Sequence, residues 1–220
     1  MKRILVLAAL LAVPMVAYAQ TADTAQPDPV KTLIPSDNFT SGGFGAPVIK
    51  VGSVDGTTGV FAGGRGGWVI NRTFVIGGGG YGWASGMHNL NTFERDTSVA
   101  FGYGGLELEY LIQSDEVVHA TIMTLIGAGG FTVFERFGSP GGDDWDNNRN
   151  LYSTATFVIE PAANVEVNIL KWLRLGLGVG YRVVTGIDYQ MQTEDGRTIT
   201  YDNSTVGGFF GVGTIKFGVY

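Results

Sequence analysis

The sequence predicts an all-β fold, an eight-stranded antiparallel up-and-down barrel whose strands cross a membrane. Residues Leu173 to Val184 alternate between an apolar row and a row of glycines with an arginine near each end. Short connections alternate with long polar ones along the chain, as in a membrane barrel. Beyond the first 19 residues, no apolar run reaches the roughly 18 residues that a spanning helix needs.

The N-terminal segment has the pattern of a secretory signal peptide. Lys2 and Arg3 precede an apolar run from Ile4 to Val16, and Ala17-Tyr18-Ala19 forms a small-residue cleavage site. We expect cleavage after Ala19, so that residues 1–19 are removed on export. Residues 20–42 are rich in proline and small polar residues and predict a flexible periplasmic leader. The barrel is expected to occupy residues 43–220.

Composition excludes several classes of function. With Lys2 and Arg3 removed from 14 basic residues against 20 acidic ones, the mature chain carries a net charge of about −8, which argues against a nucleic-acid partner. Cysteine is absent, which excludes disulfides, thiolate metal sites and a lipidated cysteine. The glycine strings Gly77 to Gly80 and Gly127 to Gly130 lack the strand–loop–helix context of a nucleotide loop, and no cofactor is expected.

Eight extended segments follow one another from residue 43 onward. Tight connections are expected at 71–72, 113–116 and 170–172, and long polar ones at 86–97, 139–150 and 190–198. Because the strand number is even, both chain ends should lie on the periplasmic side. Pro47 and Pro161 lie inside predicted strands, and we expect a β-bulge at Pro161. The predicted strands are 43–53, 58–70, 73–85, 98–112, 117–136, 151–169, 173–192 and 198–219.

Charged residues fall on the row opposite the apolar one. A lipid-facing Arg or Lys at mid-membrane costs roughly 2–4 kcal/mol, so the charged row should face the lumen. Four cations and four carboxylates could pair off there and form an ion-paired plug. The predicted lumen charge network comprises Arg65, Glu107, Glu109, Glu160, Glu166, Arg174, Arg182 and Lys216.

Aromatic residues gather near the expected membrane interfaces, where amphipathic rings are favoured. The predicted aromatic girdles contain Trp68, Tyr81, Trp83, Tyr110, Trp172, Tyr181, Phe217 and Tyr220.

These features together resemble the small eight-stranded outer-membrane proteins of the OmpA-barrel and OmpX type. The resemblance covers residues 43–220 and includes the aromatic Tyr220 after Lys216-Phe217-Gly218-Val219, and the glycine-rich run GGRGGWVINRTFVIGGGGYGW at 63–83. It implies a barrel in the cell outer membrane of a Gram-negative bacterium. The row ending in Tyr220 departs from the alternating apolar pattern of such C-termini, whereas Val219, Phe217 and Ile215 fit it better. No peptidoglycan-binding domain follows, so the anchoring role of longer relatives is not implied.

The long connections hold the remaining candidates for chemistry. Asp144, Asp146 and Asn148 have the first spacings of a calcium loop, but Arg149 and Ala155 occupy the glycine and closing Glu positions, which leaves a weak metal candidate.

Some small barrels are enzymes that act on lipid A, so we considered nucleophilic catalysis. His88 lies near Ser85 and Glu94 in one loop, and His119 is the other imidazole. This grouping is weak evidence for a catalytic site, because loops are rich in serine, histidine and carboxylate residues. We therefore expect no catalytic residues and no enzymatic activity.

The leading hypothesis is a structural or surface-interaction barrel with a largely plugged lumen. Its expected partners are outer-membrane lipid, lipopolysaccharide, the barrel-assembly machinery and an unknown extracellular ligand. Three alternatives remain open: a narrow pore, a lipid-A esterase or acyltransferase, and a soluble carrier that holds apolar ligands inside. The carrier would need Leu173, Leu175 and Leu177 to line a cavity.

Overall fold

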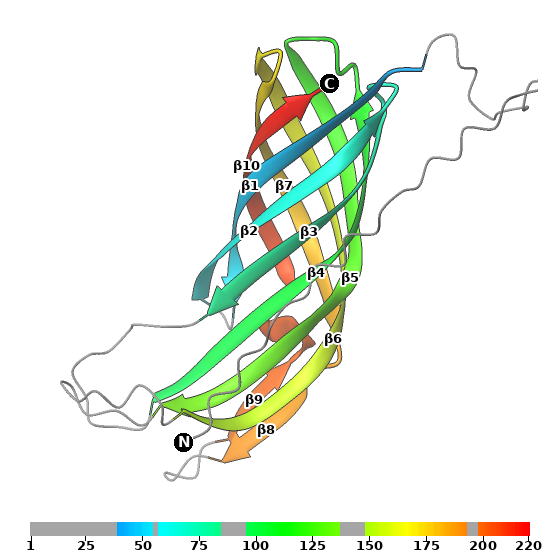
Figure 1. The fold of residues 1–220 in the computed structure, drawn as a ribbon. Coiled ribbons are helices and arrows are strands. Elements are labelled where there is room, and N and C mark those ends of the chain that lie inside the picture. Colours follow the sequence, from blue (N-terminus) through cyan, green and yellow to red (C-terminus); the bar gives the residue numbers. More distant parts are fainter. Residues whose placement is uncertain (1–38, 55–56, 85–95, 137–147, 193–197) are drawn as a thin grey trace, which may run out of the picture. The chain divides into compact units, whose positions relative to one another are not determined.

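The computed structural model describes residues 39–54, 57–84, 96–136, 148–192 and 198–220. Eight strands close into an antiparallel barrel in the order β1-β10-β7-β6-β5-β4-β3-β2, as the sequence predicts (Figure 1). None of the helical segments in these ranges is long and apolar enough to span a membrane. The barrel strands are β1 (Ser41–Val54), β2 (Thr57–Ile70), β3 (Phe74–Ala84), β4 (Asp96–Ile112), β5 (Val118–Arg136), β6 (Asn148–Leu170), β7 (Leu173–Thr185) and β10 (Gly208–Val219).

Three short turns lie at one end of the barrel, together with Tyr220; we call this the short-turn end (Figure 1). In the turn from β2 to β3, Asn71 and Arg72 both have positive φ, 50° and 53°. Two successive left-handed residues match a type I′ turn, whose twist suits adjacent antiparallel strands. At the opposite end the strands stop at residues 54, 84 and 136 and resume at 57, 96 and 148; the residues between them lie outside the described ones.

The prolines inside strands do not shift the register, and the bulge expected at Pro161 is wrong. β6 passes through Pro161, which lies opposite Thr124 of β5; the register of this ladder shifts only between Val133 and Phe134, away from the proline. On the other side, the β6–β7 pairing resumes in the same register after omitting Glu160 and Pro161. Pro47 behaves in the same way, with a gap only toward β10. Each missing N–H therefore interrupts one ladder without moving side chains to the other face.

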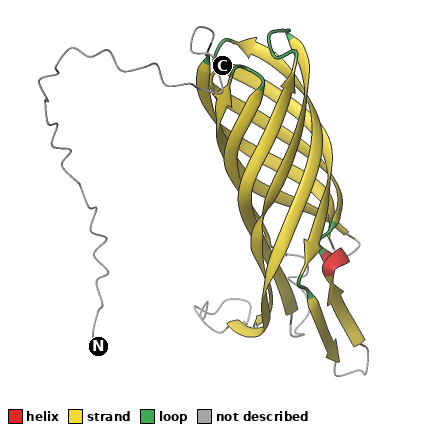
Figure 2. Ribbon diagram, turned by 90° about the vertical axis from the view of Figure 1, so that its right-hand side faces the viewer, coloured by secondary structure: helices red, strands yellow, loops and turns green. Residues whose placement is uncertain are grey.

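The last two predicted strands, 173–192 and 198–219, are each broken in two. β7 stops at Thr185, and Gly186 follows with a φ of 105°, a conformation that glycine adopts readily. Beyond it, β8 (Asp188–Gln192) and β9 (Thr198–Asp202) form a separate two-stranded sheet, and the 3-10 turn η2 (Asn203–Thr205) leads into β10. Figure 2 shows the two strands of this hairpin beyond the end of the barrel, next to the short helical turn. Tyr189 of the hairpin stacks on Tyr152 of β6, with 4.6 Å between ring centroids.

Side chains of the barrel strands alternate between wall and interior. In β7, Leu173 to Val183 point outward at odd positions, whereas Arg174 and Arg182 point inward, as predicted. Apolar side chains fill the interior near both ends. A cluster at the short-turn end contains Phe44, Ala46, Val69, Val75 and Leu111, packed against Tyr220. A larger cluster toward the other end includes Phe61, Phe101, Phe131, Val133, Val158, Val184 and Tyr201.

Candidate functional site

A continuous set of buried polar groups lies inside the barrel, and we call it the lumen network. Each of the eight barrel strands contributes at least one side chain to it. The charged members are between 0% and 7% exposed, so they are removed from solvent. The network consists of Lys50 of β1, Arg65 of β2, Tyr81 of β3, Tyr103, Glu107 and Glu109 of β4, His119 of β5, Glu160 and Glu166 of β6, Arg182 of β7, and Lys216 of β10.

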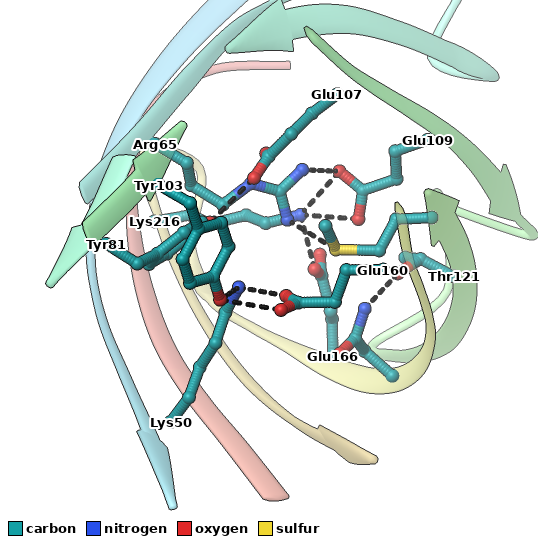
Figure 3. A network of polar contacts seen from close by, with 12 residues as sticks. Lys50, Arg65, Tyr81, Tyr103, Glu107, Glu109, Thr121, Glu160, Glu166 and Lys216 are labelled. Atoms are coloured by element: carbon teal, nitrogen blue, oxygen red, sulfur yellow. Dashed lines mark hydrogen bonds and ion pairs between the residues drawn. The ribbon is translucent and has the colours of Figure 1, made fainter. Parts of the chain in front are cut away.

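Glu160 is the centre of one half of the network. Its carboxylate pairs with the ammonium group of Lys50 and accepts a hydrogen bond of 2.8 Å from Nε of Arg182. The Tyr103 hydroxyl donates a further hydrogen bond of 2.6 Å (Figure 3). Because two cations and a hydroxyl satisfy one carboxylate, its burial is compensated on several sides.

Arg65 is the centre of the other half. Its guanidinium reaches two carboxylates of β4, with 2.6 Å from Nε to Glu107 and 2.9 Å from Nη2 to Glu109. Glu107 also accepts a 2.6 Å hydrogen bond from the Tyr81 hydroxyl, and the ring of Tyr81 lies 3.2 Å from Nζ of Lys50. Tyr81 therefore joins the two halves by a hydrogen bond on one side and a cation–π contact on the other (Figure 3).

Lys216 extends the network toward the short-turn end. Its ammonium group lies 2.9 Å from Glu109 and also pairs with Glu166. Glu166 in turn lies 3.4 Å from Nε2 of His119, a separation longer than a normal hydrogen bond between these atoms. Two carboxylates from different strands therefore share one ammonium group across the lumen.

Inward-facing glycines give the network its space. A Cβ at Gly79 would collide with the carboxylate of Glu107, and one at Gly180 would collide with the ring of Phe210. Glycine at these wall positions therefore lets long polar and aromatic side chains from the facing strands fill the barrel.

All eight charged residues of the predicted network lie on the inner face of the barrel. The expected pairing of four cations with four carboxylates is wrong in one respect. Arg174 has no ion pair with a carboxylate among the described residues, and Lys50, which the sequence analysis missed, pairs with Glu160 instead. A signal for Lys50 existed, because it is the sole charged residue of the first predicted strand, and an intramembrane charge should face inward.

The predicted girdles hold in part and need three corrections. Trp68, Tyr110, Trp172, Tyr181 and Phe217 project from the outer wall, each 43–53% exposed. Tyr81, Trp83 and Tyr220 point inward instead. Tyr81 belongs to the lumen network, Trp83 packs on Phe61, and Tyr220 packs on Phe44 at the short-turn end. Their row in the alternation decides their face, although each stands near an end of a strand.

The candidates in the long connections lie outside the described residues. These are Ser85, His88 and Glu94, and the acidic pair Asp144 and Asp146. Asn148 begins β6, but its side chain is not among those described. Within the described ranges, no group of three or more His, Cys, Asp or Glu side chains is arranged to hold a metal ion.

Comparison with known proteins finds likeness in structure but not in sequence. No protein-family model matches the chain, and no curated protein sequence matches it. Solved structures that it resembles include the N-terminal β-barrel domain of OprF from Pseudomonas aeruginosa, at 8% identity and a TM-score of 0.45, covering 80% of this chain and 96% of that one. The attachment invasion locus protein Ail of Yersinia pestis matches at 11% identity and a TM-score of 0.43, with 81% and 97% covered. Neisserial surface protein A matches at 11% and 0.42, with 82% and 94% covered.

The chain is a closed eight-stranded antiparallel β-barrel. This assignment follows from its own strand pairing, in which β1 pairs with β10 and closes the sheet. The charges inside the barrel neutralise one another, because cations and hydroxyl groups from facing strands bind the buried carboxylates.

Proposed function

We propose that the protein is an outer-membrane barrel with a structural or surface-interaction role and a lumen closed by its own side chains. The distribution of charge between the two faces of the sheet is the observation that carries this proposal. Among the described side chains of the barrel strands, no Asp, Glu, Lys or Arg projects from the outer wall. Outward residues such as Leu177 and Val179 are 75% and 66% exposed. An uncharged, apolar wall of this kind suits hydrocarbon. The backbone suits it too, because each strand of a closed barrel pairs with a neighbour on both sides.

The burial of the lumen network supports a closed lumen. Side chains that line an aqueous pore remain accessible to water, whereas Lys50 is 1% exposed and Glu160 is 0% exposed. Apolar clusters occupy the interior toward both ends of this charged layer. Opposite charges held together at this density leave no favourable path for a hydrated ion, because the ion would have to separate pairs that are already desolvated.

The short-turn end lies on the periplasmic side in this proposal, and the long connections lie outside the cell. The signal peptide, cleaved after Ala19, exports the chain to the periplasm, where the barrel-assembly machinery inserts it. The expected leader ends before Ser41, two residues earlier than the predicted bound at 42, because β1 begins there. Outer-membrane lipid and lipopolysaccharide surround the wall, and the long connections are available to an extracellular ligand. We propose no catalytic role for the described part of the chain, where His119 is buried inside the lumen network.

Two measurements test the proposal. Membrane fractionation combined with heat-shifted gel mobility should place the protein in the outer-membrane fraction, folded before boiling. Planar-bilayer recording of the purified protein should show no steady large conductance. Recovery in the soluble periplasmic extract would favour the apolar carrier, and a steady large conductance would favour an open pore.

A further inference from the structure

Arg174 is the one cation of the barrel interior that makes no ion pair with a carboxylate among the described residues. Among the described residues, the barrel interior holds five Lys and Arg side chains and four Glu side chains. The carboxylates of Glu107, Glu109, Glu160 and Glu166 all pair with other cations. Arg174 is only 5% exposed, and its Nη1 atom is buried without a hydrogen-bond partner. A buried guanidinium in this state is costly, so a negative group is expected beside it.

The two residues that lie directly opposite Arg174 in the sheet offer it no negative charge. Arg174 is the second residue of β7, just after a short turn, and lies directly opposite Lys216 of β10. Two cations opposite each other on one face of a sheet repel. Its partner on the other side, Asn168, is uncharged and directs its amide nitrogen to the carbonyls of Ser114 and Glu116.

The Tyr220 hydroxyl is a second hydrogen-bond donor without an acceptor, and it lies next to Arg174. Its ring stacks on the guanidinium, with 3.5 Å from Cζ of Arg174 to the ring centroid. The ring of Tyr220 also stacks on the ring of Phe44, with 6.2 Å between centroids and 20° between planes. The Tyr220 hydroxyl is buried and has no hydrogen-bond partner. Two side chains in contact therefore both carry N–H or O–H groups without an acceptor.

We propose that Arg174 and Tyr220 form a binding site for a phosphate-type oxyanion at the short-turn end of the lumen. A guanidinium presents paired N–H groups that match the oxygens of a phosphate, and the hydroxyl of Tyr220, just after β10, can donate to a further oxygen of the tetrahedral group. Tyr220 is half-buried and directly follows β10, so the site lies at the short-turn end of the lumen, the end from which an anion would enter. The site does not depend on the barrel residing in a membrane. Inorganic phosphate and the phosphate of a lipid headgroup offer the same chemistry.

Calorimetric titration of the full-length protein in a non-ionic detergent with inorganic phosphate tests the site. We expect saturable binding that sodium chloride at equal ionic strength does not reproduce. Arg174→Gln should weaken it on the order of tenfold or more, because a charge-assisted hydrogen bond is lost. Tyr220→Phe keeps the stacked ring, removes the hydroxyl and should weaken binding about two- to tenfold. Arg72→Gln is the matched control at the same end, since Arg72 is exposed and already pairs with Asp115 at 3.0 Å. The affinity of this variant for phosphate should equal that of the unaltered protein.

A parallel titration with short-chain phosphatidic acid identifies the source of the anion. Saturable binding of inorganic phosphate that Arg174→Gln abolishes supports a site for the free anion. The same dependence seen only with the lipid supports a headgroup site. Binding of neither probe, or equal binding by the Arg174→Gln variant, overturns the proposal. Heat-shifted gel mobility verifies folding of each variant, and if Arg174→Gln does not fold, an unchanged affinity in Tyr220→Phe overturns the proposal instead.

Discussion

Lys50 and Glu160 stand 110 residues apart in the sequence and form an ion pair at the centre of the barrel. Their strands, β1 and β6, are not neighbours in the sheet, so the two side chains reach across the lumen to meet. Arg65 and Glu109, or Lys216 and Glu166, likewise join strands that do not pair. The interior is therefore held by contacts across the barrel in addition to the ladders around it.

Removal of Lys50 should destabilise the fold strongly. Lys50→Met deletes one cation from Glu160 and leaves a buried carboxylate with less compensation, so the free energy of unfolding should fall by about 3–5 kcal/mol. Urea unfolding of the protein in lipid vesicles, followed by tryptophan fluorescence, measures the change. Arg72→Met, which breaks the exposed pair with Asp115, is the control and should cost about 1 kcal/mol or less. Equal costs for the two variants would contradict the role given to the lumen network.

Two glycines of β3 should respond differently to a methyl group. Gly79→Ala places a Cβ against the carboxylate of Glu107 and should lower the free energy of unfolding by about 1–3 kcal/mol. Gly82→Ala adds a Cβ that has no atom within 4 Å, so its effect should stay within about 0.5 kcal/mol. The same unfolding assay compares them. If both variants unfolded alike, glycine would not be creating the space that the inner face needs.

A charge on the outer wall should be costly only in a bilayer. Leu177 is 75% exposed in the middle of β7, and Leu177→Lys should destabilise the barrel in vesicles by about 2–4 kcal/mol. Gln190→Lys, on an exposed position of the β8–β9 hairpin, is the matched control and should change little. A wall that lies in water would instead accept Leu177→Lys without loss of stability.

Asp202 is the N-cap of the 3-10 turn η2 and should make this turn sensitive to acid. Hydrogen bonds from the side chain and backbone of Ser204 lower the pKa of the exposed Asp202 carboxyl below its ordinary value. A folded-state pKa below the unfolded one stabilises the turn above the unfolded pKa, about 4, and this contribution is lost as pH falls through the folded value. The amide resonance of Ser204 in an NMR titration should therefore shift only below pH about 4, and Asp202→Asn should abolish the shift. A midpoint above the ordinary aspartate value would contradict the cap.

Alternation in the sequence predicted the fold and most of the inner charges, because apolar and charged rows separate cleanly in β4, β6 and β7. It failed for Lys50, since both rows of β1 are apolar or glycine around it and no contrast marks the inner face. Tyr81 and Trp83 follow four consecutive glycines, which remove the contrast in β3. The partners inside the lumen were beyond prediction, because strand pairing fixes neighbours around the barrel but not which side chains meet across it.

The central claim is that the apolar row faces lipid and the charged row fills a closed interior. The chain has no cysteine, so single cysteines along β7, from Leu173 to Val184, can each carry a spin label in vesicles. Accessibility to oxygen and to a water-soluble nickel reagent tests the claim most directly. The account predicts high oxygen accessibility at Leu175, Leu177 and Val179, and low accessibility to both reagents at the inward-facing Gly176 and Val184. Nickel access at the even positions would reveal a water-filled lumen, and nickel access at the odd positions would place the apolar wall in water; either result would contradict the account.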